Sequence, residues 1–347
     1  MPELPEVEVV RRGLEPRTVG RLIESVEVLD PRILRRQSGG ADRLRGALAG
    51  TRMTAVVRRG KFLWWRLADE TGEDTGEALM AHLGMSGQLR VRDAGPLTPG
   101  RSEAAAPSEL APSEGPASDP LRHRRLSLHL DDGTAIDLID QRIFGGIWSS
   151  PLEPAADGSL AGLGSPDAML PTDAARIARD LLDPAADLPA IARTIRSRRA
   201  GVKSLLLAQD LVSGIGNIYA DEALWEARTR YDTPGAALTQ RRALAILRAA
   251  GAVMERALAV GGTSFDALYV NVEGRSGYLD IDVERVEGSR AHEGRDCLCR
   301  ASAMRRQAIL RSDLARRALD KQLNGPAHLV AHRHKVGSRS LRGVACA

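Results

Sequence analysis

Residues 126–138 read LSLHLDDGTAIDL, and this stretch decides the fold class of the first half of the chain. Apolar residues alternate with polar ones on either side of the pair Asp132–Gly133. Such alternation is typical of half-buried strands, and an Asp-Gly pair between two alternating runs is a strong signal for a β-hairpin. The stretch therefore predicts two antiparallel strands.

The same period of two extends outward over about residues 21–147. Ahead of it, Pro5 suits the first turn of a helix, and Glu6 and Glu8 favour the positive end of that helix. We therefore expect residues 2–148 to form an N-terminal antiparallel β-sandwich with flanking helices.

Composition marks the remaining boundaries. Residues 93–120 are rich in Ala, Pro, Ser and Glu and have almost nothing to bury, which predicts a disordered insert between two strands. Residues 149–172 are rich in Pro, Gly and Ser and predict a linker. Beyond them apolar residues recur with a helical period, so residues 173–285 predict a helical domain, followed by a tail over residues 286–347. The helical segments are expected near 173–183, 188–199, 203–210, 217–228 and 238–260. The expected fold class is α+β with several domains.

Size and charge limit the class of protein. A chain of 347 residues with 43% hydrophobic content can bury a sizeable core, and its net charge of +4 favours an acidic partner. No apolar run approaches the roughly 20 residues of a membrane span, and the N-terminus lacks the basic and then apolar character of a secretory signal. Three cysteines are too few for a disulfide framework. We expect a cytoplasmic protein that does not bind membranes.

The first residues carry candidate chemistry. Removal of Met1 would expose the secondary amine of Pro2, and because α-amino groups have a reference pKa near 8, part of it would be neutral and nucleophilic at cell pH. Attack by this amine on the anomeric carbon of a nucleotide would expel the base and leave a Schiff-base intermediate. Glu3 and Glu6 are close enough in sequence to protonate the leaving base and to move protons. Taken alone, the segment is more typical of an ordinary helix start.

The opening residues 2–8, PELPEVE, resemble the N-terminus of formamidopyrimidine-DNA glycosylases, and further motifs match that family in order and spacing over about residues 2–285. These motifs are Gly60-Lys61-Phe62, His82-Leu83-Gly84-Met85-Ser86-Gly87, Asp140-Gln141-Arg142-Ile143-Phe144-Gly145-Gly146, Gly214-Ile215-Gly216-Asn217-Ile218-Tyr219-Ala220-Asp221-Glu222 and Gly261-Gly262-Thr263-Ser264. Leu4 is the third residue once Met1 is removed, and a Leu rather than a Gly at this position resembles the branch of the family that acts on oxidised purines. The resemblance implies a base-excision repair enzyme that removes 8-oxoguanine and formamidopyrimidines from duplex DNA and then cleaves the abasic strand by β,δ-elimination.

The resemblance also implies catalytic roles. Pro2 would be the nucleophile, Glu3 and Glu6 would transfer protons, and Lys61, at the turn of an expected hairpin, would meet a phosphate and lower the cost of charge build-up. Without the resemblance, Lys61 would be a solvated hairpin lysine.

A second set of residues would act on the opened base pair, because an enzyme that extrudes a base must fill the gap and satisfy the partner base. The resemblance makes Met85 an apolar filler, Phe144 a stacking wedge and Arg142 a guanidinium that faces the estranged base. On composition alone, Met85 and Phe144 would be core residues and Arg142 a surface charge. Ile143 stands where many relatives carry a second Arg, which puts a phosphate contact from that position in question.

The helical domain would hold the DNA backbone. Gly214-Ile215-Gly216-Asn217 resembles the family's helix-two-turn-helix element, in which Asn217 and Lys203 bind phosphates. His82 and Tyr219, which lie within the matching motifs, are also assigned to DNA binding. Residues 262–279, Gly-rich and polar, resemble a mobile loop that closes over the extruded purine.

The tail departs from the family. Relatives usually end in a zinc finger with two Cys-x2-Cys pairs, whereas this chain has Cys297-Leu298-Cys299 and no second pair. Four ligands are needed for a closed structural zinc site, and His328, His332 and Cys346 leave an alternative set open. We expect a degenerate finger, no bound metal and no other cofactor.

Three functions are consistent with these features. The first is a monomeric, nucleoid-associated glycosylase and lyase acting on double-stranded DNA with oxidised purines. The second is a DNA-binding relic of little activity, because the finger is altered. The third is an oxidised-pyrimidine glycosylase of the endonuclease VIII branch. The intact set Pro2, Glu3, Glu6 and Lys61 favours the first, since a relic would have no reason to retain it.

Overall fold

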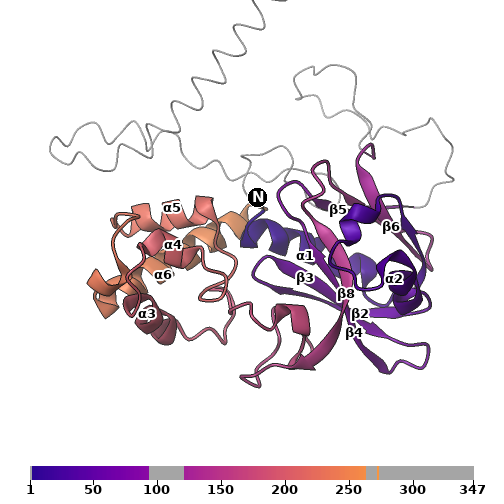
Figure 1. Cartoon of the computed structure of the whole chain (residues 1–347), viewed down its shortest axis with the longest axis horizontal. Coiled ribbons are helices and arrows are strands. Elements are labelled where there is room, and N and C mark those ends of the chain that lie inside the picture. The colour runs from indigo at the N-terminus through magenta and orange to yellow at the C-terminus, as the bar shows by residue number, and fades with distance from the viewer. Residues whose placement is uncertain (1, 94–120, 263–271, 273–347) are drawn as a thin grey trace, which may run out of the picture. The chain divides into compact units, whose positions relative to one another are not determined.

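The computed structural model describes residues 2–93, 121–262 and 272. Its first half contains two antiparallel sheets (Figure 1). The four-stranded sheet has the order β1 (Ile23–Val28), β6 (Arg124–Leu130), β7 (Ala135–Ile139) and β5 (Gln88–Arg92). The five-stranded sheet has the order β2 (Arg52–Arg59), β3 (Phe62–Ala68), β4 (Asp74–His82), β8 (Gly146–Pro154) and β9 (Met169–Pro171).

The hairpin predicted from the Asp-Gly pair is β6 and β7, which pair antiparallel with Leu128 opposite Ile136. Both residues are buried in one core with apolar side chains of the second sheet, such as Leu63 and Leu79. The predicted β-sandwich is thus confirmed. The flanking helices are α1 (Leu4–Thr18), the 3-10 turn η1 (Pro31–Leu34) and α2 (Gly40–Leu48).

The linker predicted over residues 149–172 is wrong at its two ends, where residues 149–154 and 169–171 are strand. Strand β8 continues from the motif that ends at Gly146 and pairs with β4 between Gly146 and Pro151, and β9 then pairs with the end of β8. Three prolines lie in these two strands, at 151, 154 and 171. Pro151 is the last residue of β8 that pairs with β4, Pro154 ends β8, and Pro171 ends the edge strand β9. Proline is tolerated where a ladder ends or at a sheet edge, so a Pro-rich composition did not exclude strands here.

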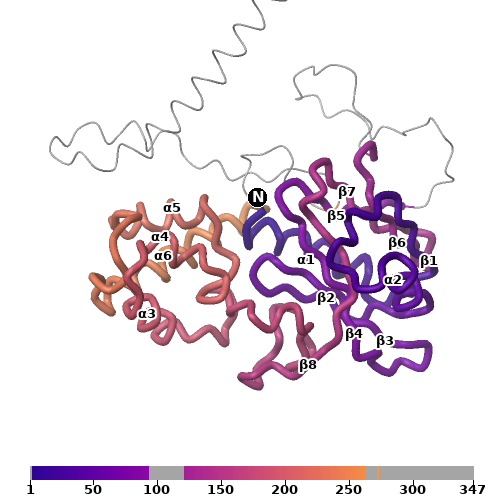
Figure 2. The backbone as a smooth tube through the Cα atoms, in the orientation of Figure 1, coloured from indigo at the N-terminus to yellow at the C-terminus, as the bar shows by residue number. Residues whose placement is uncertain are grey.

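The second half is helical, as predicted (Figure 2). Its elements are the 3-10 turn η2 (Thr172–Ala174), α3 (Leu188–Arg196), α4 (Val202–Leu206), α5 (Asn217–Glu226), the 3-10 turn η3 (Gly235–Ala237) and α6 (Gln240–Ala259). The helix expected over 173–183 is reduced to η2 and turns. Apolar side chains of α3 to α6 form a separate core that includes Ile195, Tyr219 and Ile246.

Helix α1 belongs to both cores. Leu4 is buried in the core of the helical half, whereas Val7 and Val10 are buried in the core of the sandwich. The Leu4 amide also donates to the Gly214 carbonyl at 3.0 Å. The first turn of the chain therefore lies where the two halves meet.

Several expectations fall outside the described residues. They are the insert, apart from its first residue, the tail over residues 286–347, and the loop over residues 262–279, of which only Gly262 and Val272 are described. Across the described ranges, none of the helices has both the length and the apolar composition that a membrane span requires.

Candidate active site

The carboxylate of Glu3 lies at the start of helix α5. It accepts hydrogen bonds from the backbone amides of Gly216 at 2.7 Å, Ile218 at 2.9 Å and Tyr219 at 3.2 Å. These amides form the positive end of the helix, which favours an anion. A Cβ on Gly216 would lie 2.4 Å from Glu3 Cδ, so this approach requires glycine at that position.

Burial decides the protonation behaviour of Glu3. The residue is only 3% exposed, and this burial raises the pKa of its carboxyl above the ordinary value of 4.5. The amides of Ile218 and Tyr219 and the charge of Lys61 act in the opposite direction but do not cancel the effect. A raised pKa makes the protonated form of the carboxyl, which can donate a proton, more accessible.

Glu6 is held beside Glu3 by two donors. One carboxylate oxygen accepts from the Tyr219 hydroxyl at 2.8 Å, and the other accepts from the Glu3 amide at 2.9 Å. Tyr219 is fully buried. Its hydroxyl therefore contacts Glu6 in the interior, whereas the sequence had assigned Tyr219 to DNA binding. Pro2 is also buried, directly before this pair of carboxyls.

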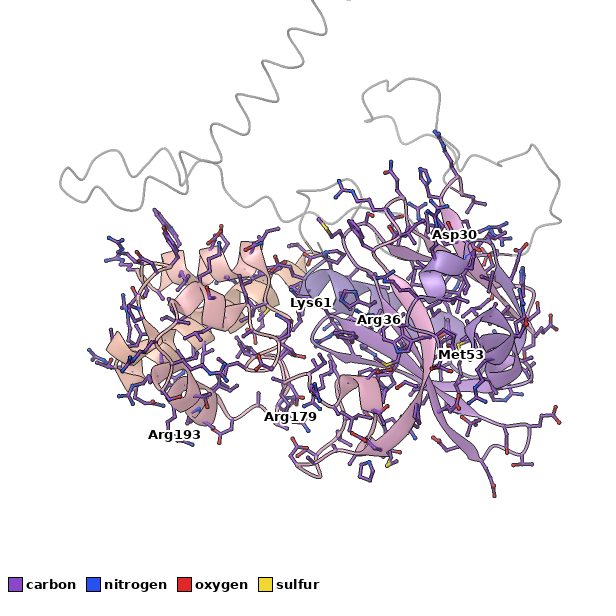
Figure 3. The ribbon with its side chains drawn as sticks, viewed as in Figure 1. Asp30, Arg36, Met53, Lys61, Arg179 and Arg193 are labelled. Atoms are coloured by element: carbon purple, nitrogen blue, oxygen red, sulfur yellow. The ribbon has the colours of Figure 1, made fainter. Side chains whose placement is uncertain are left out.

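Lys61 and Gly60 form the two-residue turn between β2 and β3, in which Gly60 has a φ of +58° (Figure 3). The Lys61 ammonium group donates to the Ile215 carbonyl at 2.9 Å, and the residue is 6% exposed. Burial lowers the pKa of Lys61, while the charges of Glu3 and Glu6 oppose this shift. Lys61 is thus a buried cation beside both carboxyls, and not a solvated hairpin lysine.

A buried ion network that the sequence analysis missed supports this turn. Arg58, which has no exposed surface, pairs with Glu8 at 2.9 Å and with Asp180 at 2.7 Å. Asp180 also accepts from the Gly60 amide at 3.1 Å. The sequence carries no signal for this network, because Arg58 is followed directly by Arg59 and, after Gly60, by Lys61, and nothing local marks Arg58 as buried. The network joins α1, the β2–β3 turn and the segment that leads into the helical half.

The residues expected to act on a base pair lie on two touching loops. Met85 is 41% exposed and Phe144 is 50% exposed, so neither is a core residue. A Cβ on Gly84 would lie 2.4 Å from the Phe144 carbonyl carbon, which shows how closely the loops approach. Asp140 ties them together, because it accepts from Ser86 Oγ at 2.7 Å and from the Gly145 amide at 2.7 Å.

Arg142 and Ile143 differ in their surroundings. Arg142 is exposed, and its amide donates to Asp140 at 3.1 Å. Ile143 has a φ of +56° and packs against the sandwich core. Its side chain therefore contributes to packing, at the position where many relatives would carry a second arginine.

His82 lies at the end of β4 and is neutral. Its Nδ1 accepts from the Gly84 amide at 3.1 Å, and its ring packs against Phe62 with 4.8 Å between centroids. Burial, together with the charges of Arg36, Lys61 and Arg35, lowers the pKa of His82 to about 4. The proton of the neutral ring is therefore on Nε2, which leaves a hydrogen-bond donor for an anion.

The two phosphate-binding candidates of the helical half lie on neighbouring helices. Lys203 of α4 forms an ion pair with Asp221 of α5 at 2.8 Å. Asn217 is exposed at the first position of α5.

The predicted site residues thus fall into two groups. Glu3, Glu6, Lys61 and Tyr219 form a buried group that Pro2 directly precedes in the chain, and Met85, Arg142 and Phe144 lie on the two touching loops.

Metal ligands are not clustered in the part of the chain that the structure describes, where no group of three or more His, Cys, Asp or Glu side chains could hold an ion. The candidates Cys297, Cys299, His328, His332 and Cys346 lie outside those residues.

Known proteins share both halves of this chain. Residues 1–147 match the formamidopyrimidine-DNA glycosylase N-terminal domain, and residues 177–268 match the H2TH domain of the same glycosylases. A formamidopyrimidine-DNA glycosylase of Kineococcus radiotolerans is 44% identical over 316 residues, which cover 89% of this chain and 94% of the relative. A relative of the same name from Leifsonia xyli is 45% identical over 280 residues, or 80% of this chain and 86% of the relative.

Solved structures agree with these matches. The MutM (Fpg) protein of Thermus thermophilus has a TM-score of 0.59 and 28% identity, with 86% of this chain and 90% of that chain covered. The Lactococcus lactis formamidopyrimidine-DNA glycosylase, solved non-covalently bound to DNA that contains an AP site, has a TM-score of 0.55 and 26% identity, with 75% and 83% covered. The chain belongs to the formamidopyrimidine-DNA glycosylase family.

Proposed function

We propose that this protein is a DNA glycosylase that removes oxidised purines, such as 8-oxoguanine and formamidopyrimidines, from duplex DNA and then cleaves the abasic strand. One observation carries the proposal: a buried Glu3 is hydrogen-bonded to Glu6, a buried Lys61 interacts electrostatically with both carboxyls, and the buried Pro2 directly precedes Glu3 in the chain. The relatives with about 44% identity are named formamidopyrimidine-DNA glycosylases, which supports the same activity.

The chemistry follows from this arrangement. After removal of Met1, the Pro2 nitrogen would attack C1′ of the damaged nucleotide, and the bond between C1′ and the base would break. Glu3, whose protonated form is favoured by burial, would donate a proton to the departing base. The sugar ring would then open: the C1′–O4′ bond breaks, O4′ takes up a proton, and the electron pair of the Pro2 nitrogen forms an iminium with C1′. The iminium acidifies the neighbouring C2′ hydrogen, so a carboxylate such as Glu6 can remove this proton while the 3′ phosphate leaves.

The remaining residues would hold the duplex. The exposed Met85 and Phe144 can fill the gap left by the extruded base, and Arg142 can face its partner. Lys61 and the Nε2 proton of His82 can meet phosphates near the damaged nucleotide, and Lys203 and Asn217 can bind the backbone elsewhere. We propose further that the protein acts as a monomer on chromosomal DNA, in the cytoplasm and at the nucleoid.

Borohydride trapping tests the nucleophile directly. Protein lacking Met1 should form a reducible covalent adduct with a duplex containing 8-oxoguanine, and Pro2→Gly should weaken this adduct severely. Asp232→Asn, in an exposed ion pair outside the site, should trap like the unaltered protein. An undiminished adduct in the Pro2 variant would exclude the proposed nucleophile, and the absence of any adduct with unaltered protein would exclude the activity.

The tail is proposed to hold no stoichiometric zinc. Two cysteines one residue apart rarely provide the geometry of a Cys-x2-Cys turn, and a set completed by His328 and His332 would close a loop of nearly 30 residues at an entropic cost. Chelation should therefore change neither thermal stability nor DNA binding. Elemental analysis that finds one tightly held zinc per chain, whose removal abolishes DNA binding, would contradict this.

A further inference from the structure

We propose that Arg35 is a positioning residue for the segment that enters the opened base pair, residues 142–145, here named the insertion loop. Arg35 would hold this loop rigid enough to resist the base stack, so that excision from paired DNA depends on it. The inference rests on the proposed function, and it concerns a side chain to which the sequence analysis gave no role.

The contacts of Arg35 are concentrated on the loop backbone. One guanidinium nitrogen donates to the carbonyl oxygens of Ile143 at 3.0 Å and Gly145 at 2.5 Å, and the other donates to that of Phe144 at 2.5 Å. One planar group thus holds three successive carbonyls. Asp140 holds the amides of Arg142 and Gly145. The loop is therefore fixed by a cation on its carbonyls and by an anion on its amides.

The loop needs such support because its backbone is strained. Ile143 has a φ of +56°, and a β-branched residue in this left-handed region is a genuine outlier. Strained conformations persist where the surroundings over-determine them. Here the Ile143 side chain packs against the sandwich core, while Phe144 is left 50% exposed. Loss of the carbonyl contacts would allow the loop to relax and Phe144 to move.

The backbone of Arg35 is held in place by the turn that precedes it. Arg35 directly follows η1, in which Ile33 and Leu34 are buried in the sandwich core. Asp30 caps that turn by accepting from the Arg32 amide at 3.1 Å. A lysine at position 35 would keep the charge, but its single nitrogen cannot reproduce a fork that reaches three carbonyls. Charge and clamping can therefore be separated by substitution.

The test compares two substrates and three variants. Excision rates are measured on 8-oxoguanine paired with cytosine and on 8-oxoguanine in an unpaired bubble, where no base pair has to be opened. Arg35→Met and Arg35→Lys should both reduce excision from the paired duplex by about tenfold, the effect of roughly 1.4 kcal/mol, and should lose much less on the bubble. Arg36→Met removes a neighbouring charge that stacks on Trp148 and should leave the ratio of the two rates unchanged.

Other roles of Arg35 would give different excision rates on the two substrates. If Arg35 acted only as a phosphate contact, Arg35→Lys would retain activity, and Arg35→Met would lose equally on both substrates with a smaller salt dependence; either result would overturn the proposal. Unchanged excision by Arg35→Met would do the same. Thermal melting checks that the variants fold, and if Arg35→Met does not, Arg35→Lys decides alone. If the unaltered protein excises 8-oxoguanine from neither substrate, the proposed function itself is wrong.

Discussion

At the scale of single residues, burial and neighbouring charges shift the pKa values of Glu3 and Lys61 in opposite directions, and burial has the larger effect. Glu3 has three amide donors, which alone would keep it ionised, yet its burial raises its pKa. Lys61 is the mirror case, because its burial lowers its pKa although two carboxyls lie nearby. Each shift moves a group towards its neutral form. A neutral carboxyl can donate a proton and a neutral amine can accept one, which suits a site that must protonate one leaving group and deprotonate a carbon.

The raised pKa of Glu3 predicts the pH dependence of base excision. If protonated Glu3 is the acid, the rate should rise with pH as Pro2 loses its proton and fall with pH as Glu3 loses its own, giving a bell. Glu3→Gln should lower excision and remove the alkaline fall, because the amide does not titrate. Cleavage of a pre-formed abasic site, measured as the control, should be reduced less. A bell that persists in Glu3→Gln would assign the alkaline limb to another group.

His82 predicts how stability depends on pH. Its pKa is about 4 in the folded protein and near 6.5 in an unfolded chain, so between these values only the unfolded state gains the proton. This contribution to stability is therefore present above about pH 6.5 and lost as the pH falls to about 4, by up to about 3 kcal/mol. His82→Phe, which keeps a ring against Phe62, should show a smaller acid loss in urea titrations. Parallel pH curves for the two proteins would refute this.

At the scale of elements, the buried ion pairs of Arg58 connect helix α1, the β2–β3 turn and the segment around Asp180. Asp180→Asn should weaken two ion-pair contacts to a guanidinium that has no access to water. Breaking a buried pair costs about 3–5 kcal/mol, and this loss should appear in denaturant unfolding. Asp232→Asn, which breaks an exposed pair with Arg230, should lower the free energy of unfolding far less, because exposed ion pairs contribute little to stability. Equal costs for the two variants would mean that the buried network does not contribute as described.

Sequence patterns predicted the elements unevenly, for physical reasons. The β6–β7 hairpin was evident because alternation and turn chemistry agree at the Asp132–Gly133 pair. Strands β8 and β9 were missed because local composition does not reveal which partner strand lies beside a Pro-rich segment. The residues Pro2, Glu3, Glu6 and Lys61 came from the motifs, but Arg58, Asp180 and Arg35 did not. Their importance depends on contacts with residues more than a hundred positions away, which no local pattern records.

At the scale of the whole molecule, binding of any duplex is expected to depend on Lys203 and its ion pair. Lys203→Ala should weaken duplex binding with and without a lesion, and should reduce the slope of log affinity against log salt by about 1. Asp221→Asn is the matched variant, since it removes the anion at 2.8 Å from the same ammonium group and should strengthen binding. Fluorescence anisotropy over a salt series measures both. An unchanged slope in Lys203→Ala would mean that this side chain does not meet a phosphate.

The attachment of Glu3 and Leu4 to the turn at Gly214–Gly216 also has a consequence during synthesis on the ribosome. These two residues leave the ribosome among the first, but their partners lie more than 200 positions later in the chain. Translation at about 5–20 residues per second places roughly ten to forty seconds between them. Through that interval the N-terminal segment cannot adopt its final contacts, and Met1 is open to removal. Once the partners emerge, Pro2, Glu3 and Leu4 become buried, so the interval before that is when the N-terminal segment is fully open to the enzyme that exposes the nucleophile.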